Sequence, residues 1–176
     1  MGFTQPCFIR KNSPELRKKL EELGYEPNFS MGKYPEVYKN IAVCNFFGNR
    51  YYGVSDDETT RPGDITDAIK NRGLIDCGTN EELFFALAAL RDDSDYMQWF
   101  VSPKTHTKRL PGCFGQVIGM DGHYKKIVGY EWHKHENKDS ALTERLNSMI
   151  QMEVEDMEFL PHKATVEELI EHFKKE

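Results

Sequence analysis

The sequence predicts an α+β fold, with an antiparallel or mixed sheet and about four helices packed mainly on one face. Two observations support this. A short unit occurs three times, at 7–16, 75–83 and 159–169, and in each an apolar run precedes a capping residue, an acidic residue and an amphipathic stretch. Two other regions place apolar runs on either side of a glycine-containing turn, as β-hairpins do. Because hairpins separate the helical units, the strict alternation of a doubly wound sheet is missing.

Each repeated unit predicts the start of a helix. In a capping box the cap side chain accepts a hydrogen bond from a first-turn amide, and an acidic side chain three residues later accepts one from the cap amide. Three pairs have this spacing: Asn12 with Glu15, Thr79 with Glu82, and Thr165 with Glu168. Gly24 predicts the end of the first helix. The stretch 83–90 is apolar on all sides, which predicts a central buried helix, and 140–152 has the spacing of a fourth.

Two hairpins are expected. The runs 41–47 and 51–54 flank Gly48-Asn49, a dipeptide that suits the positive backbone angles of a tight turn. The second hairpin is centred on Asp121-Gly122, and its strands are 115–119 and 124–132. One more strand is predicted at 96–101, with aromatic residues on both faces. Two segments rich in proline, glycine, lysine and threonine predict long surface loops: 24–39 and 102–112.

Length and composition indicate one domain. The 176 residues are 39% hydrophobic, and we expect a single α+β domain over 1–176. There is no run of eighteen apolar residues and no basic segment followed by an apolar one at the start, so we expect a soluble, cytoplasmic protein without membrane contact. Four cysteines lie more than thirty residues apart: Cys7, Cys44, Cys77 and Cys113. This spacing lacks the close pairs of zinc and redox motifs and favours reduced, mostly buried thiols.

The charge is unevenly distributed along the chain. Residues 1–135 contain 18 basic and 18 acidic side chains, whereas 136–176 contain 5 and 11, so the net charge of -6 belongs to the C-terminal stretch. This disfavours nucleic-acid binding through a broad basic face. Local basic groups occur within 11–19, where they predict a solvated helix face, and at Lys104, Lys108 and Arg109.

Three stretches make up about a third of the chain: Pro6 to Tyr25, Ile75 to Phe100, which contains the run Ala88-Ala89-Leu90-Arg91-Asp92-Asp93-Ser94-Asp95, and Lys163 to Phe173. They resemble segments of small proteins of no known activity from gut Bacteroides-type bacteria and their phages or prophages. The resemblance implies a mobile-element origin. It supplies no catalytic residues.

The best enzymatic hypothesis concerns Cys77, His123 and His135. A cysteine just before a helix lies near the positive end of the helix dipole, which favours the thiolate, and a histidine on a neighbouring strand can act as its base. The order of these residues is similar to that in NlpC/P60-type cysteine peptidases. The resemblance implies that Cys77 is the nucleophile, His123 the base and His135 the orienting group. Three features depart from this family: the predicted cap Thr79 follows Cys77 by two residues, no turn separates the histidines, and the family usually acts on cell walls. The alternative is a buried thiol with two surface histidines.

A metal site is the other chemical hypothesis. His133 and His135 lie on one side of any strand that contains both. Four further candidate ligands are near in sequence: Asp121, His123, Glu131 and Glu136. Such pairs arise easily at the polar end of a hairpin. We therefore expect no metal and no cofactor.

Four aromatic residues suggest binding instead: Tyr25, Phe29, Tyr34 and Tyr38. They lie in or beside the 24–39 loop, where they can anchor a partner or pack the loop onto the domain. We expect a macromolecule-binding or inhibitor module of phage or mobile-element origin, more a binder than an enzyme, acting on an unidentified host or phage protein. The alternative is a cysteine hydrolase using Cys77 and His123. The hydrolase needs these two residues close together and Cys77 accessible, whereas a binding module needs an exposed apolar or aromatic patch. The sequence does not define an oligomeric state.

Overall fold

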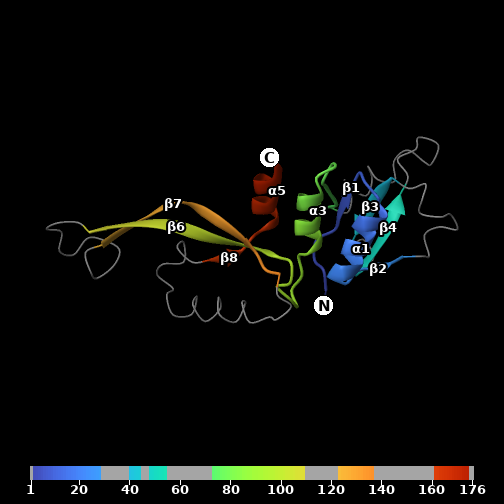
Figure 1. The fold of residues 1–176 in the computed structure, drawn as a ribbon, viewed down its shortest axis with the longest axis horizontal. Coiled ribbons are helices and arrows are strands. Elements are labelled where there is room, and N and C mark those ends of the chain that lie inside the picture. The colour runs from blue at the N-terminus through green and yellow to red at the C-terminus, as the bar shows by residue number, and fades with distance from the viewer. Residues whose placement is uncertain are drawn as a thin grey trace.

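A computed structural model describes residues 2–28, 40–44, 48–54, 73–109, 123–136 and 161–174, with the backbone alone for 105–109 and 123–126. Within these ranges the fold is α+β, with three helices, a five-stranded mixed sheet and a three-stranded antiparallel sheet (Figure 1). The helices are α1 (Pro14–Leu23), α3 (Glu81–Ala88) and α5 (Val166–Lys174). The strands are β1 (Cys7–Ile9), β2 (Glu26–Pro27), β3 (Ile41–Cys44), β4 (Arg50–Val54), β5 (Ile75–Asp76), β6 (Trp99–Arg109), β7 (His123–Lys134) and β8 (His162–Lys163).

The five-stranded sheet has the order β2-β4-β3-β1-β5. Strands β3 and β4 form the first predicted hairpin, with Ile41 opposite Val54 and Cys44 opposite Tyr51. Gly48 has a φ of 75°, a backbone angle that glycine adopts without steric cost. Strand β1 runs antiparallel to β3 and parallel to β5, so the sheet is mixed. The mixed sheet confirms the predicted class.

The helix starts follow the sequence prediction with two shifts of one residue. Ser13 caps α1 in place of Asn12, since its Oγ accepts from the Leu16 amide at 3.2 Å. Asn80 caps α3 in place of Thr79, and its Oδ1 accepts from the Leu83 amide at 2.9 Å. Thr79 precedes the cap position by one residue, because the Asn80 amide donates to the Cys77 carbonyl at 3.0 Å and closes a turn that contains Thr79.

The other two helix-end predictions are confirmed. The Glu168 amide donates to Thr165 Oγ1 at 3.2 Å, and the Thr165 amide donates to a Glu168 carboxylate oxygen at 2.9 Å. These reciprocal bonds are the capping box at the start of α5. Gly24 ends α1 with a φ of 108°.

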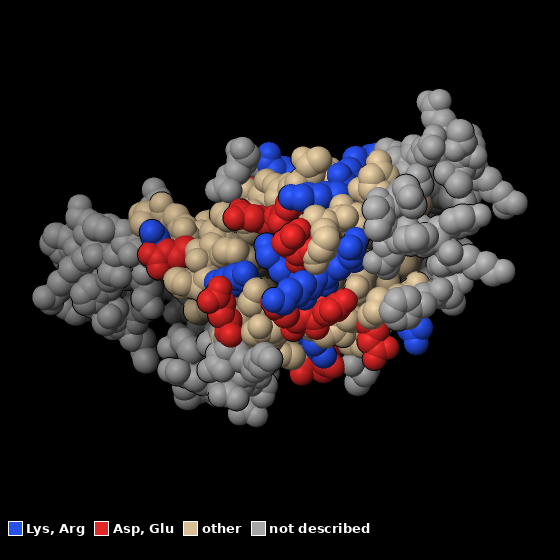
Figure 2. All heavy atoms as spheres, turned by 45° about the vertical axis from the view of Figure 1, so that its right-hand side comes forward, with Lys and Arg blue, Asp and Glu red and all other residues tan. Residues whose placement is uncertain are grey.

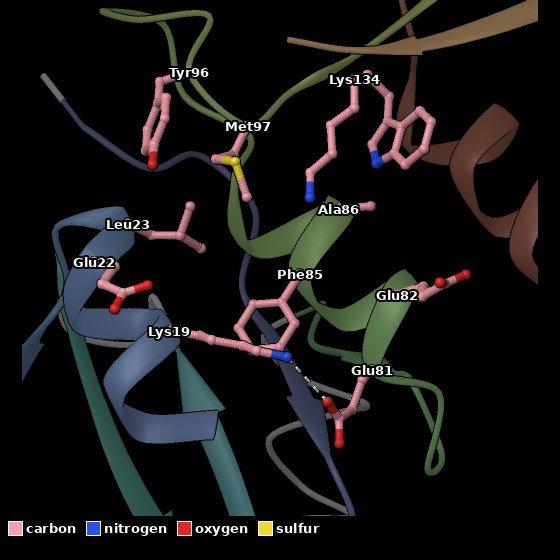
Figure 3. Close-up of a pocket in the computed structure, with 11 residues that line it drawn as sticks. Lys19, Glu22, Leu23, Glu81, Glu82, Phe85, Ala86, Tyr96, Met97 and Lys134 are labelled. Carbon is pink, nitrogen blue, oxygen red and sulfur yellow. Dashed lines mark ion pairs between the residues drawn. The ribbon is translucent and has the colours of Figure 1, made fainter. Parts of the chain in front are cut away.

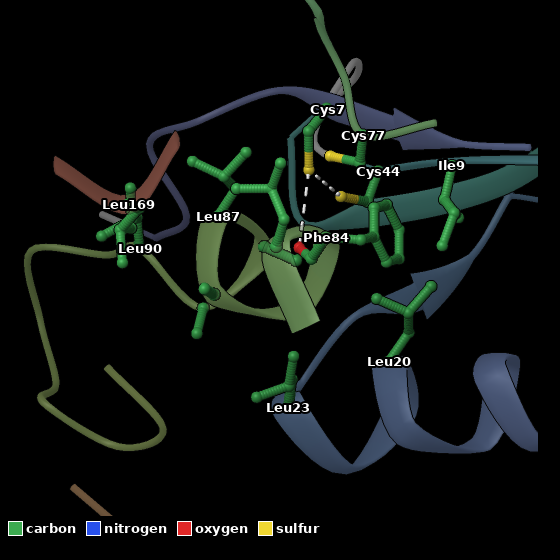
Figure 4. Close-up of a cluster of buried hydrophobic side chains, with 14 of the residues drawn as sticks. Cys7, Ile9, Leu20, Leu23, Cys44, Cys77, Phe84, Leu87, Leu90 and Leu169 are labelled. Atoms are coloured by element: carbon green, nitrogen blue, oxygen red, sulfur yellow. Dashed lines mark hydrogen bonds between the residues drawn. The ribbon is translucent and has the colours of Figure 1, made fainter. Parts of the chain in front are cut away.

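The main core lies between the sheet and the helices α1 and α3 (Figure 4). Leu16 and Leu20 from α1 and Phe84 from α3 are at most 1% exposed, and they pack with Cys7 and Ile9 of β1. Helix α3 is central, as predicted, because α5 packs on it through Leu169 and Phe173. The five-stranded sheet with these three helices is called the body below.

The long strands β6 and β7 pair from Trp99 opposite Lys134 to Arg109 opposite His123, with an irregularity after Lys104. Strand β8 pairs only with Phe100 and Val101. Within the described residues, β6 and β7 therefore form a two-stranded ribbon beyond Ser102, which extends away from the body in Figure 1 and is called the ribbon below.

The ribbon corrects one sequence prediction. The segment predicted as a loop at 102–112 is strand as far as Arg109, and it pairs with β7, which contains the strand predicted at 124–132. Pro103 favoured the loop prediction, but proline is tolerated in an edge strand, and among the described residues β8 pairs with β6 only at Phe100 and Val101. The segment 115–119 and the predicted helix at 140–152 lie outside the described residues. No helix in the described ranges is long and apolar enough to cross a membrane.

Candidate functional site

A cavity of about 450 Å³ opens between α1, α3 and the segment that leads from α3 into β6 (Figure 3). Six apolar or aromatic residues line it: Leu23, Phe85, Ala86, Tyr96, Met97 and Trp99. Five charged residues complete the lining: Lys19, Glu22, Glu81, Glu82 and Lys134. A largely apolar cavity with a few charged groups is the usual form of a ligand or side-chain binding site.

The apolar composition of α3 explains the floor of this cavity. Phe84 is fully buried against the sheet, so its neighbour Phe85 faces the other way and remains half-buried in the cavity. The two rings meet edge to face, with centroids 5.5 Å apart. Trp99, at the start of β6, packs edge to face on Phe173 of α5 at 5.4 Å. Phe85 and Trp99, two of the three aromatic lining residues, are therefore each packed against a second aromatic ring.

Met97 lines the cavity with an uncommon backbone angle. Its φ is 62°, and among the described residues it is the one non-glycine residue with a positive φ. Backbone bonds hold it in place, since its amide donates to the His135 carbonyl at 2.6 Å and the Gln98 amide donates to the Asp95 carbonyl at 3.0 Å. Such a conformation costs on the order of 1–3 kcal/mol and is found most often at functional sites.

Figure 2 shows basic and acidic side chains interspersed over the described surface of the face that it presents. Two of the three acidic side chains that line the cavity, Glu81 and Glu22, have lysine partners. Glu81 binds Lys11 and lies 3.6 Å from Lys19, and its hydrogen bond to Lys11 lowers its pKa. Glu22 lies 4.0 Å from Lys18. In Figure 3 the amine of Lys19 lies beside the Phe85 ring, 5.3 Å from its centroid.

Lys134 approaches from the opposite wall. Its side chain points from β7 into the cavity above Ala86, whereas Glu82 points away from the Phe85 ring (Figure 3). The ion pair from Lys134 to the exposed Glu136 is long, at 3.9 Å. The group directed at the apolar floor is therefore a cation.

The structure places Cys77 in the core. It is 4% exposed, its amide donates to the Phe8 carbonyl at 2.9 Å, and its sulfur gathers with those of Cys7 and Cys44 (Figure 4). The Sγ atoms of Cys7 and Cys44 are 3.4 Å apart. Burial raises the pKa of the Cys7 thiol well above its ordinary value. The Cys7 thiol is therefore protonated at neutral pH, and all three cysteines are buried core residues.

The two histidines of the hydrolase hypothesis lie elsewhere. His123 pairs with Arg109 at the end of the ribbon farthest from the body, roughly 33 Å of strand beyond Trp99. His135 directly follows β7, at the end of the strand nearest the body, and its ring packs edge to face on Phe100 with the ring centroids 6.3 Å apart. The structure thus does not bring Cys77 and His123 together, because the 102–109 segment forms a long strand instead of a loop that folds back.

Of the four aromatic residues predicted to bind a partner, the structure describes one, Tyr25. Tyr25 is 2% exposed, stacks on Phe3 at 3.9 Å and donates its hydroxyl hydrogen to the Ala88 carbonyl at 2.8 Å. It is therefore a core residue, and the expectation that it contacts a partner is wrong. The other three residues, Phe29, Tyr34 and Tyr38, lie outside the described residues.

No group of three or more histidine, cysteine or acidic side chains in the described part of the chain is arranged to hold a metal. His133 lies 3.7 Å from Glu131 on β7.

Sequence reasoning missed the cavity residues, although two patterns pointed towards them. The stretch 83–90 has no polar face, so one of its rings faces away from the sheet; this ring is Phe85. Aromatic residues occur on both faces of 96–101, so when Phe100 is buried its neighbour Trp99 lies on the other face of the strand. Nothing in the local sequence indicated the angle of Met97 or the position of Lys134.

No protein-family model, curated protein or solved structure matches this chain.

Proposed function

We propose that this chain is a binding module of phage or related mobile-element origin that contacts a host or phage protein through the cavity between α1, α3 and β6. One observation supports this most directly: half-buried aromatic residues form an open floor beside Met97, which the backbone holds in a strained conformation. Strain of this kind persists only where the surrounding structure holds it in place, and it clusters at functional sites.

The shape and charge of the cavity favour a bulky apolar side chain beside a carboxylate. A volume of about 450 Å³ accommodates one large aromatic side chain with part of its backbone. Burial of apolar surface against Phe85 and Trp99 stabilises the complex by roughly 25 cal/mol per Å². Lys134 then pairs with the carboxylate, because Glu81 and Glu22 on the other wall already have lysine partners.

A titration followed by ¹H–¹⁵N NMR tests this proposal. N-acetyl-tryptophan has the aromatic ring and the carboxylate, whereas N-acetyl-tryptophanamide has the ring alone. We expect N-acetyl-tryptophan at millimolar concentration to shift the amide signals of Phe85, Met97 and Trp99 and to bind several-fold more tightly than the amide, because Lys134 faces the carboxylate.

Two variants sharpen the test. Lys134→Gln removes the preference for the carboxylate and leaves the binding of the amide unchanged. Lys174→Gln, on the exposed side of α5, removes the same charge without touching the cavity and keeps the preference. If neither probe shifts the amide signals of the cavity, or if both variants behave alike, the proposal fails. Binding of both probes with equal affinity shows a general apolar site and contradicts the role of Lys134.

A further inference from the structure

The distal part of the ribbon, residues 105–109 and 123–130, has a charge that contrasts with the rest of the chain. These thirteen residues contain four Lys or Arg, two histidines and no acidic residue, whereas the whole chain contains 23 basic and 29 acidic residues. The basic residues are Lys108, Arg109, Lys125 and Lys126. The nearest acidic residue along the strands, Glu131, pairs with Lys104 at 3.0 Å.

The register concentrates these residues in space. Strands β6 and β7 bring 105–109, with two of the basic residues, beside 123–127, with the other two. Lys125 and Lys126 are adjacent on β7, so they occupy opposite faces of the ribbon. Nearer the body, Val128 and Tyr130 are 63% and 56% exposed, the two large apolar residues described as exposed. The distal ribbon is therefore basic on both faces, next to exposed apolar side chains.

We propose that this ribbon binds duplex DNA by inserting into the major groove. Two antiparallel strands lie about 4.8 Å apart, and the major groove, about 12 Å wide, admits a ribbon of this kind. The eight residues 123–130 extend for about 26 Å, which is most of one turn of B-DNA. Basic residues on both faces are suited to the phosphates that border the groove on either side, and Val128 is suited to contact with thymine methyl groups.

The geometry favours DNA over the other polyanions. The major groove of A-form RNA is too deep and narrow for a ribbon with side chains. A membrane surface is flat and meets one face of a ribbon, whereas here the basic residues occupy both. The inference does not depend on the cavity. The charge of the whole chain led us to expect no nucleic-acid binding. That net charge hides the basic ribbon, because the rest of the chain is acidic.

Fluorescence anisotropy with a labelled 20-base-pair duplex tests the proposal on the whole chain between 50 and 200 mM KCl. Four phosphate contacts give a slope of log K against log salt of about -3.6. The ribbon variant combines Lys108→Gln, Lys125→Gln and Lys126→Gln, and we expect its affinity at 50 mM to fall at least about 100-fold and its slope to shrink by two to three. The control variant combines Lys18→Gln, Arg50→Gln and Lys174→Gln, three exposed positions on the body, and we expect less than about a three-fold loss.

A second measurement on the native chain covers the case in which the ribbon variant does not fold. Lysines are acetylated with and without DNA and mapped by mass spectrometry. We expect DNA to protect Lys125 and Lys126 and to leave Lys18 reactive.

Four outcomes overturn the proposal: no binding at 50 mM KCl, an equal loss in the control variant, duplex RNA bound at least as tightly as DNA, or phosphatidylserine vesicles bound at least as tightly as DNA. The last two would assign the ribbon to RNA or to a membrane surface.

Discussion

The body and the ribbon are built on opposite principles. In the body, Leu16 and Leu20 of α1, Phe84 of α3 and Phe8 of β1 are almost fully buried, and three cysteines are also removed from solvent. In the ribbon, Val128 and Tyr130 remain more than half exposed. The comparison shows that buried apolar surface is concentrated in the body, whereas the ribbon keeps large apolar side chains exposed, and the cavity lies where the two regions meet.

The largest difference is expected for core truncation. Phe84→Ala removes a ring that is fully buried and leaves a cavity, so we expect a loss of about 3–5 kcal/mol in the free energy of unfolding. Val128→Ala, on the exposed ribbon, is expected to change it by less than about 0.5 kcal/mol. Urea unfolding followed by circular dichroism measures both. Similar losses would show that the ribbon is part of the cooperative core.

Met97, at the junction, is expected to give an intermediate effect. Met97→Val places a β-branched side chain at a positive φ and is expected to destabilise the protein by roughly 1–3 kcal/mol. Met97→Asn is expected to change stability by less than about 1 kcal/mol, since asparagine adopts this angle more readily. Thermal unfolding distinguishes the pair, and equal stability of the two variants would show that backbone angle is unimportant here.

The smallest effect concerns Glu81, whose pKa is lowered from 4.5 chiefly by its hydrogen bond to Lys11. A lowered pKa in the folded state adds stability above pH 4.5, and this contribution is lost as the pH falls through the folded-state value. Because the pair is partly exposed, we expect only a few tenths of a kcal/mol. Urea unfolding at pH 7 and pH 3 should show a smaller pH dependence for Lys11→Gln than for the native chain, and an unchanged dependence would contradict this assignment.

Local sequence predicted the parts of the fold that depend on neighbouring residues. The bonds between Thr165 and Glu168, the end of α1 at Gly24 and the β3–β4 hairpin each involve residues close along the chain. The ribbon could not be predicted in the same way. Its strands pair across a sequence separation that grows towards the body, and Pro103 within β6 is typical of a loop.

The candidate site was harder to predict because tertiary packing decides it. Tyr25 is an apolar ring beside a loop in the sequence, and only its stacking on Phe3 shows that it is buried. Cys77 precedes a helix, yet the parallel pairing of β5 with β1 places it among other thiols. Conversely, Lys134 and Phe85 are far apart in sequence and line the same cavity only because β7 returns to the body.

The reactivity of the buried thiols measures how often the body opens locally. A thiol reagent reaches Cys7 or Cys44 only when the strands around them separate, so the modification rate, under conditions where closing is faster than reaction, reports the opening equilibrium. Mass mapping of each cysteine then resolves whether β1, β3 and β5 open together or one strand at a time.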